Sequence, residues 1–312
     1  MTRFRLVAFA LLCLGAVGCV EGEMTSVVNP DGSAKVRMEV VTCLPLTPFS
    51  PGPKKKDDES LDDIRRRAVR PMLESPGVSA WKDVSAEFLP NGRLKFSGIA
   101  YVKQLEQFDL KNGAPLLAAT HTVMRAEDGS LKLIPKKKEE DGLNTQGRKF
   151  KTQDEIKKMT DEELDKYILR ELIELQSSKP FLTAMFTDAK LKVTYVLPGD
   201  ITAATGFERD GQKAFYLVDG NKILATLNKN LNQDQPAWRK LYRSAADHDA
   251  LLFEVLGWGA LTTTATVAKP GKPLFDFDKE VKEARDAYPE LRKKFGFGDD
   301  LRLPTEDGPP KK

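Results

Sequence analysis

Short runs of alternating apolar and polar residues recur along the chain, and turn-forming residues separate them. Val36, Met38 and Val40 alternate with charged side chains and follow the turn sequence Asp31-Gly32. A period of two is typical of a strand with one buried face, and glycine tolerates the positive φ that a tight turn requires. The same pattern predicts further strands in residues 84–102, 118–134, 190–196, 214–218 and 223–227.

A second tight connection is predicted at Pro198-Gly199, between a run that ends at Val196 and another extended piece that starts at Ile201. If this connection is tight, Gly199 adopts a positive φ. Because strands joined by short turns pair antiparallel, we expect a mainly antiparallel sheet built from hairpins.

Apolar residues at helical spacing predict three to five helices packed on this sheet, so the expected fold class is α+β. Thr160 and Glu163 form a capping box before a stripe that starts at Leu164, and this helix is expected to end near Ser177. Other helices are predicted to begin at Ser60, at Pro236, near Ser244 and at Phe277, the last of them ending at Gly296.

The composition divides the 312 residues into a leader at 1–18, a folded unit at 19–303 and a tail at 304–312. The tail has almost no apolar content and is expected to be disordered. Within the folded unit, residues 48–59 and 135–152 carry opposed runs of charge and are expected to be mobile. One folded unit is favoured over two domains, because the strands on both sides of 135–152 can share a sheet.

The leader has the basic, apolar and small-residue pattern of a secretory signal. Residues 6–16 carry no charge and are followed by Val17-Gly18-Cys19, which resembles a bacterial lipobox. The resemblance implies a signal peptide cleaved between Gly18 and Cys19, and a lipid such as palmitate on Cys19 that anchors the protein in the cell-envelope membrane. The domain would face the periplasm or the exterior, and the lack of Asp directly after Cys19 favours the outer membrane. The alternatives are an ordinary secretory signal and a short buried helix.

Neither the charge nor the cysteines indicate nucleic acid or a cofactor. The 49 basic and 46 acidic residues nearly balance, and loss of the leader removes two arginines and no acid. Cys13 would leave with the leader and Cys19 would be lipidated, so Cys43 remains alone. An intramolecular disulfide and a cysteine zinc site are therefore not expected in the mature chain.

The sequence contains neither a GxxxxGK phosphate loop nor a GxSxG nucleophile elbow, and it has two histidines. Asp247-His248-Asp249 is a weak candidate for a metal site. Consecutive helix residues point about 100° apart, so these side chains do not converge on one ion, and the acids instead complement a helix start. His121 lies in a predicted strand and is interpreted as packed or solvated. Replacement of both histidines is expected to cost little stability.

Three tryptophans, Trp81, Trp238 and Trp258, each border an apolar stretch and are expected to lie in the core. The apolar segment Leu251–Trp258 is too short to cross a bilayer. We expect it to pack beneath the sheet, and contact with a membrane surface is the alternative.

Two passages resemble the LppM-like family of envelope lipoproteins. Residues 24–33, MTSVVNPDGS, are similar to the opening hairpin of that family, and residues 193–215 are similar to its closing section. The second passage contains Pro198-Gly199 and has Phe215 where the family tends to have Trp. The resemblance implies a small α/β module, anchored by lipid, without established catalytic residues. This chain departs from the family by its long middle part and by lacking a C-terminal membrane segment.

These observations favour a non-catalytic, lipid-anchored envelope protein that binds an envelope protein or a lipid, or that has a structural role. One alternative is a secreted hydrolase that uses carboxylates as acid and base, and another is a lipid carrier. Converging carboxylates in a deep pocket would favour the hydrolase, and a dry apolar cavity would favour the carrier. A packed core with an exposed apolar patch would favour the binding protein.

Overall fold

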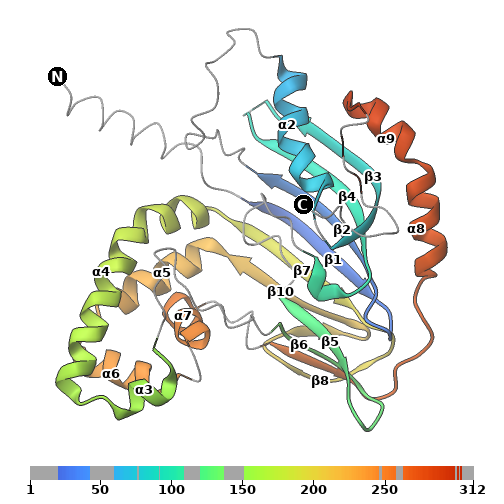
Figure 1. Cartoon of the computed structure of the whole chain (residues 1–312). Helices are drawn as coiled ribbons and strands as arrows, with labels where there is room; N and C mark the ends of the chain where they lie inside the picture. The colour runs from blue at the N-terminus through green and yellow to red at the C-terminus, as the bar shows by residue number, and fades with distance from the viewer. Residues whose placement is uncertain are drawn as a thin grey trace, which may run out of the picture.

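The computed structural model describes residues 20–42, 60–75, 77–90, 92–108, 120–136, 151–245, 248–257 and 263–298, together with 301 and 303. These residues form two sheets, with helices on the sheet faces and a group of helices at one side (Figure 1). The predicted α+β class with mainly antiparallel sheets is confirmed.

The larger sheet has seven strands in the order β3-β4-β2-β1-β7-β10-β9. All neighbours are antiparallel except β1 and β7, which run parallel with Glu21 beside Lys190. The strands are β1 (Glu21–Val28), β2 (Ala34–Thr42), β3 (Val78–Phe88), β4 (Leu94–Val102), β7 (Lys190–Val196), β9 (Glu208–Asp210) and β10 (Lys213–Asp219).

The smaller sheet has four antiparallel strands in the order β5-β6-β11-β8. They are β5 (His121–Arg125), β6 (Leu131–Pro135), β8 (Ile201–Thr205) and β11 (Thr264–Val267). The chain passes from β7 to β8 through Pro198-Gly199, so these two strands belong to different sheets and do not form the predicted hairpin. The positive φ expected of Gly199 is confirmed at 153°.

Three hairpins close with the same turn. In the first, Asn29 N donates to Ser33 O at 2.8 Å and Gly32 N donates to Asn29 O at 3.0 Å. The glycine of each turn adopts a left-handed conformation, with φ of 88° at Gly32, 76° at Gly92 and 79° at Gly129. A three-residue loop with glycine in this position lets two strands pair closely, which confirms these turns as predicted from their Asp-Gly or Asn-Gly sequences.

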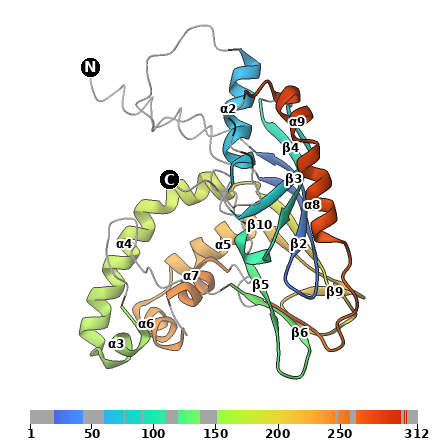
Figure 2. The ribbon, with the colours of Figure 1, turned by 45° about the vertical axis from the view of Figure 1, so that its right-hand side comes forward.

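The helices fall into three groups. Helices α3 to α7 lie together beside the sheets, α2 covers strands β3 and β4, and α8 and α9 lie on the other side of those strands (Figures 1 and 2). They are α2 (Leu61–Leu73), α3 (Gln153–Lys158), α4 (Asp161–Phe186), α5 (Gly220–Leu231), α6 (Gln235–Ser244), α7 (His248–Leu256), α8 (Phe277–Asp286) and α9 (Tyr288–Phe295), with a short 3-10 helix η1 (Leu105–Gln107).

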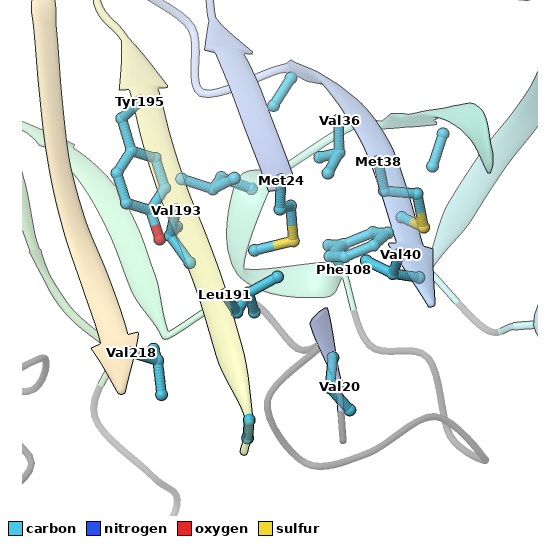
Figure 3. Close-up of a cluster of buried hydrophobic side chains, with 14 of the residues drawn as sticks. Val20, Met24, Val36, Met38, Val40, Phe108, Leu191, Val193, Tyr195 and Val218 are labelled. Carbon is cyan, nitrogen blue, oxygen red and sulfur yellow. The ribbon is translucent and has the colours of Figure 1, made fainter. Parts of the chain in front are cut away.

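One face of the larger sheet forms the centre of the main core. Met24 lies opposite Met38 across β1 and β2 and beside Val193 across β1 and β7, and all three are about 1% exposed. Figure 3 shows these side chains on one side of the strands, with Phe108 packed against them. Burial of each such side chain stabilises the fold by about 1.5–3 kcal/mol. A shift of one residue in the pairing would turn these side chains to the other face, so their alternation determines the register of the strands.

The helices are more numerous than expected, for identifiable reasons. Residues 223–227, predicted as a strand, lie in α5, because the Asp219 carboxylate accepts from Asn221 N at 3.1 Å and from Lys222 N at 3.2 Å as a helix cap. The helix predicted from Phe277 to Gly296 is divided at Ala287 into α8 and α9. Helix α4 continues past Pro180 to Phe186 rather than ending near Ser177.

Several predictions concern residues outside the described ranges. They include the leader, Cys19, Cys43, residues 48–59, most of 135–152, Asp247, Trp258 and the tail. Trp81 and Trp238 are each 1% exposed and confirm the expected core positions. Helix α7 packs against α5, where Asn230 Nδ2 donates to Val255 O at 2.9 Å, rather than beneath a sheet. Within the described ranges, no helix is long and apolar enough to cross a membrane.

Candidate functional site

A buried polar cluster around His121 joins the two sheets. The His121 side chain is 0% exposed, and its Nδ1 atom lies 2.8 Å from Thr120 Oγ1 and 3.1 Å from the Tyr195 hydroxyl. Its Nε2 atom lies 2.7 Å from Thr263 Oγ1 and 3.2 Å from the Thr263 carbonyl oxygen. Because a carbonyl oxygen only accepts, Nε2 carries the proton and Nδ1 accepts from a hydroxyl. The cluster thus ties β5 to β7 and to the start of β11.

The environment of His121 indicates a structural role. Burial lowers the pKa of the imidazole to about 4, because the charged ring would lose its hydration. The rings of Tyr195 and Phe207 lie with their centroids 5.2 Å from that of His121. Of the two interpretations of His121, packed or solvated, the packed one is therefore confirmed. The expectation that its replacement costs little stability is revised, because replacement would remove the buried hydrogen bonds of the ring to Tyr195 and Thr263.

Buried polar contacts also fix α8 on the larger sheet. Asn29 is 2% exposed, donates from Nδ2 to Phe275 O at 3.1 Å and accepts from Leu274 N at 2.8 Å. Glu280 on α8 accepts from Lys35 Nζ at 3.0 Å and from the Tyr101 hydroxyl at 2.8 Å. These contacts hold the helix against the face of the sheet opposite the main core.

A groove of about 400 Å³ runs beside these contacts, between α8 and the sheet. Burial and the Glu280 carboxylate raise the pKa of Tyr101, so its hydroxyl stays protonated. Two lysines are paired with two glutamates in the groove, Lys35 with Glu280 at 3.0 Å and Lys82 with Glu283 at 3.5 Å. Both glutamates lie on α8 and both lysines lie on the larger sheet, so these ion pairs help to hold the helix on the sheet.

A second depression, which we call the trough, opens where the two sheets and a loop meet. Its volume is about 610 Å³. The β1–β2 turn, strand β5 and the loop between β11 and α8 each contribute to its walls. Its lining residues are Pro30, Asp31, Gly32, Val123, Arg125, Gly271 and Pro273.

The trough brings together the two turns that the sequence singled out. Asp31 and Gly32 line it directly, and Gly271 in its wall donates its N–H to Pro198 O. A Cβ at Gly199 would lie 2.7 Å from Val267 Cγ1 and 2.9 Å from Lys269 O, so glycine allows the two loops to approach.

The trough carries one acidic and one basic side chain, those of Asp31 and Arg125. The Asp31 carboxylate accepts from Ser33 N at 3.0 Å and from Ser33 Oγ at 2.7 Å, which fixes it in the turn. Arg125 is exposed, and in the described part of the chain no ion pair joins its guanidinium to an acid. Sequence reasoning missed Arg125 and Pro273, because only the folded topology brings β5 and the 271–273 loop to this turn.

The weak metal candidate receives no support from the described residues. Asp247 lies outside them, and His248 and Asp249 are described only as part of the backbone of α7. Among the residues whose side chains are described, no group of three or more histidine, cysteine or acidic side chains is placed to hold a metal ion.

Comparison with known proteins finds a weak structural resemblance to a solved structure. No protein-family model and no curated protein matches the sequence. Among solved structures, the chain is similar to the NMR structure of the folded domain of Mycobacterium tuberculosis LppM. The identity is 13%, the match covers 65% of this chain and 84% of that one, and the TM-score is 0.24. A TM-score this low carries no argument about function, so the sequence resemblance to LppM-like lipoproteins stays a prediction.

Proposed function

We propose that this protein is a non-catalytic lipoprotein of the bacterial cell envelope, anchored through Cys19, whose domain binds an envelope partner at the trough. One observation carries the proposal: Val20, which directly follows the lipobox cysteine in the sequence, is buried at the start of the larger sheet. Val20 is 4% exposed, its carbonyl oxygen accepts from Lys190 N at 2.8 Å, and β1 starts at Glu21. The cleavage site inferred from sequence therefore coincides with the start of the described sheet.

The start of β1 is firmly held, which supports a short and direct attachment to the membrane. Arg93 donates to both carboxylate oxygens of Glu21, at 3.1 and 3.0 Å. Such a bidentate pair orients both side chains and lowers the pKa of Glu21. With no linker between Cys19 and this end of the sheet, a lipid on Cys19 would hold this edge of the domain at the bilayer.

The trough lies at the opposite end of β1 from the anchor. Strand β1 has 8 residues, so at a rise of about 3.3 Å per residue its first and last Cα atoms are about 23 Å apart. The turn that lines the trough directly follows the distal end of the strand. An anchored domain would thus present the trough away from the membrane surface, where a partner in the envelope can reach it.

Detergent partitioning of the Cys19→Ala variant tests the anchor. In cells of the natural host, the wild-type protein is expected in the detergent phase and the variant in the aqueous phase, because the acyl chains supply most of the membrane affinity. Cys43→Ala is the matched control and is expected to partition like the wild type. Equal partitioning of Cys19→Ala and wild type would contradict the proposal. Density-gradient fractionation of the wild type then tests the predicted preference for the outer membrane.

A further inference from the structure

The two sheets have four outer strands, and they differ in how their free edges are covered. On β3, Ser79 O accepts from Arg285 at 3.2 Å and Val84 O accepts from Lys294 Nζ at 2.8 Å. Trp81 N donates to the Tyr288 hydroxyl at 3.3 Å. Side chains of α8 and α9 therefore form hydrogen bonds with the outward backbone groups of this strand, and these bonds protect the strand from pairing with another chain.

Two further edges offer little to a partner. On β8, Arg209 Nη1 donates to the carbonyl oxygens of Ile201 and Thr202, both at 3.1 Å. Strand β9 has 3 residues, Glu208–Asp210, so its free edge offers few backbone groups to another strand. The remaining outer strand is β5, which borders the trough. Helix η1 contacts this strand, and Thr122 Oγ1 donates to Glu106 Oε2 at 2.9 Å, so the part of the edge considered for pairing is at Val123 and Arg125.

The hydrogen-bond register of β5 shows which of its backbone groups face outward. Lys136 N donates to Thr120 O at 2.9 Å, and Ala126 N donates to Ser130 O at 2.9 Å. Residues of an antiparallel pair alternate between bonding their neighbour and facing away. Thr122 and Met124 thus bond β6, while Val123 and Arg125 direct their N–H and C=O groups away from it. In the part of the chain that the structure describes, no hydrogen bond to these outward groups is found.

The side chains around this edge suit an extended and acidic segment. Pro30 and Pro273 form walls without N–H groups, and the neighbouring Leu274 is 38% exposed. Arg125 supplies positive charge, while the Asp31 carboxylate is fixed in its turn by Ser33. A strand added at Val123 and Arg125 would gain main-chain hydrogen bonds, and a carboxylate on it would meet Arg125.

We propose that the trough binds an extended peptide segment of a partner protein, which pairs with the outward backbone groups of Val123 and Arg125 and places a carboxylate side chain on Arg125. The proposal deepens the partner-binding part of the proposed function. It does not depend on the lipid, because the trough is formed entirely by the folded domain.

Binding of two labelled peptides to the detergent-solubilised full-length protein tests the proposal. The probes are the end-blocked heptapeptide TVEVTVT with a fluorescein label and the same peptide with Lys in place of Glu, measured by fluorescence anisotropy at low salt. The wild type is expected to bind the Glu peptide about tenfold more tightly than the Lys peptide, and Arg125→Glu is expected to reverse that preference. Failure of the wild type to bind the Glu peptide, or equal binding of both peptides, would overturn the proposal.

A backbone variant separates strand pairing from simple charge attraction. Val123→Pro removes an outward N–H and leaves the ladder to β6 intact, so it is expected to weaken binding of the Glu peptide about tenfold. Val123→Thr keeps the N–H and is expected to bind like the wild type. Unchanged binding by a folded Val123→Pro would contradict strand addition. If Val123→Pro does not fold because the proline ring does not fit this strand, the peptide preference of Arg125→Glu is the deciding result, and an unreversed preference would overturn the proposal.

Sedimentation velocity provides the remaining control. The wild type in detergent is expected to carry a single copy of the chain, with β5 open. A dimer that Arg125→Glu dissociates would show that a second copy occupies the edge and would overturn the choice of partner. Because Cys19→Ala keeps the trough, it is expected to bind the Glu peptide like the wild type. Failure of the anchor and failure of the peptide site are thus distinguishable.

Discussion

Acidification should destabilise this protein through His121. The folded-state pKa of this imidazole is about 4, whereas an exposed histidine in the unfolded chain has a pKa of about 6.5. Below pH 6.5 the unfolded chain therefore binds a proton that the folded protein excludes, so stability falls as the pH decreases towards 4. The linkage relation gives a loss of about 2 kcal/mol between pH 7 and pH 5, and about 3 kcal/mol by pH 4.

Urea denaturation at pH 7, 6 and 5 measures this loss, with the fluorescence of the buried Trp81 and Trp238 as the signal. Acidic residues also contribute to the pH dependence, so a matched variant is needed. His121→Gln keeps a polar side chain but removes the titrating group. It is expected to be less stable than the wild type at pH 7 and to lose about 2 kcal/mol less between pH 7 and pH 5.

Two results would refute this reasoning. Parallel pH profiles for the wild type and His121→Gln would show that His121 does not take up a proton on unfolding. An NMR titration in which the His121 ring protonates near pH 6.5 in the folded protein would show that the ring is hydrated rather than enclosed. Because His248 is present in both proteins, its titration cancels in the comparison.

Three further changes test the fold around the trough and the helices by thermal unfolding. Gly199→Ala should cost about 1–3 kcal/mol more than Gly129→Ala, because both glycines have positive φ but only Gly199 is crowded; equal costs would contradict the close approach of the two loops. Asn29→Ala should cost about 1–3 kcal/mol by leaving the backbone at residues 274–275 without its buried partner, and an unchanged melting temperature would show that Asn29 does not hold this loop. Asp219→Ala should cost about 1 kcal/mol, and a cost near zero would argue against its role as the cap of α5.

The sequence was sufficient for features that depend on neighbouring residues. The turns at Gly32, Gly92 and Gly129 were predictable because Asp-Gly and Asn-Gly carry their own backbone preference. The capping box of Thr160 with Glu163 likewise marked the start of α4. The same local signal misled at Asp219, where an Asp-Gly sequence caps a helix instead of closing a hairpin, because the side chain accepts from the next turn of backbone.

Features that depend on distant residues could not be predicted. The assignment of β7 and β8 to different sheets is decided by pairing with β1 and β11, which lie far away in sequence. The trough likewise requires Arg125 and Pro273 to meet the first turn, and neither residue stands in a recognisable motif. The alternation around His121 indicated a strand, but the partners of the ring, Tyr195 and Thr263, lie far away in sequence, so the polar cluster was missed.

We propose above that Cys19 is the lipid-bearing first residue of the mature protein. Mass spectrometry of the tryptic peptide that spans residues 19–35, isolated from native membranes, tests it most directly. We expect this peptide to begin at Cys19 and to carry the added mass of a diacylglyceryl group on the cysteine. A peptide that begins at another residue, or an unmodified Cys19 in the membrane-bound protein, would contradict it.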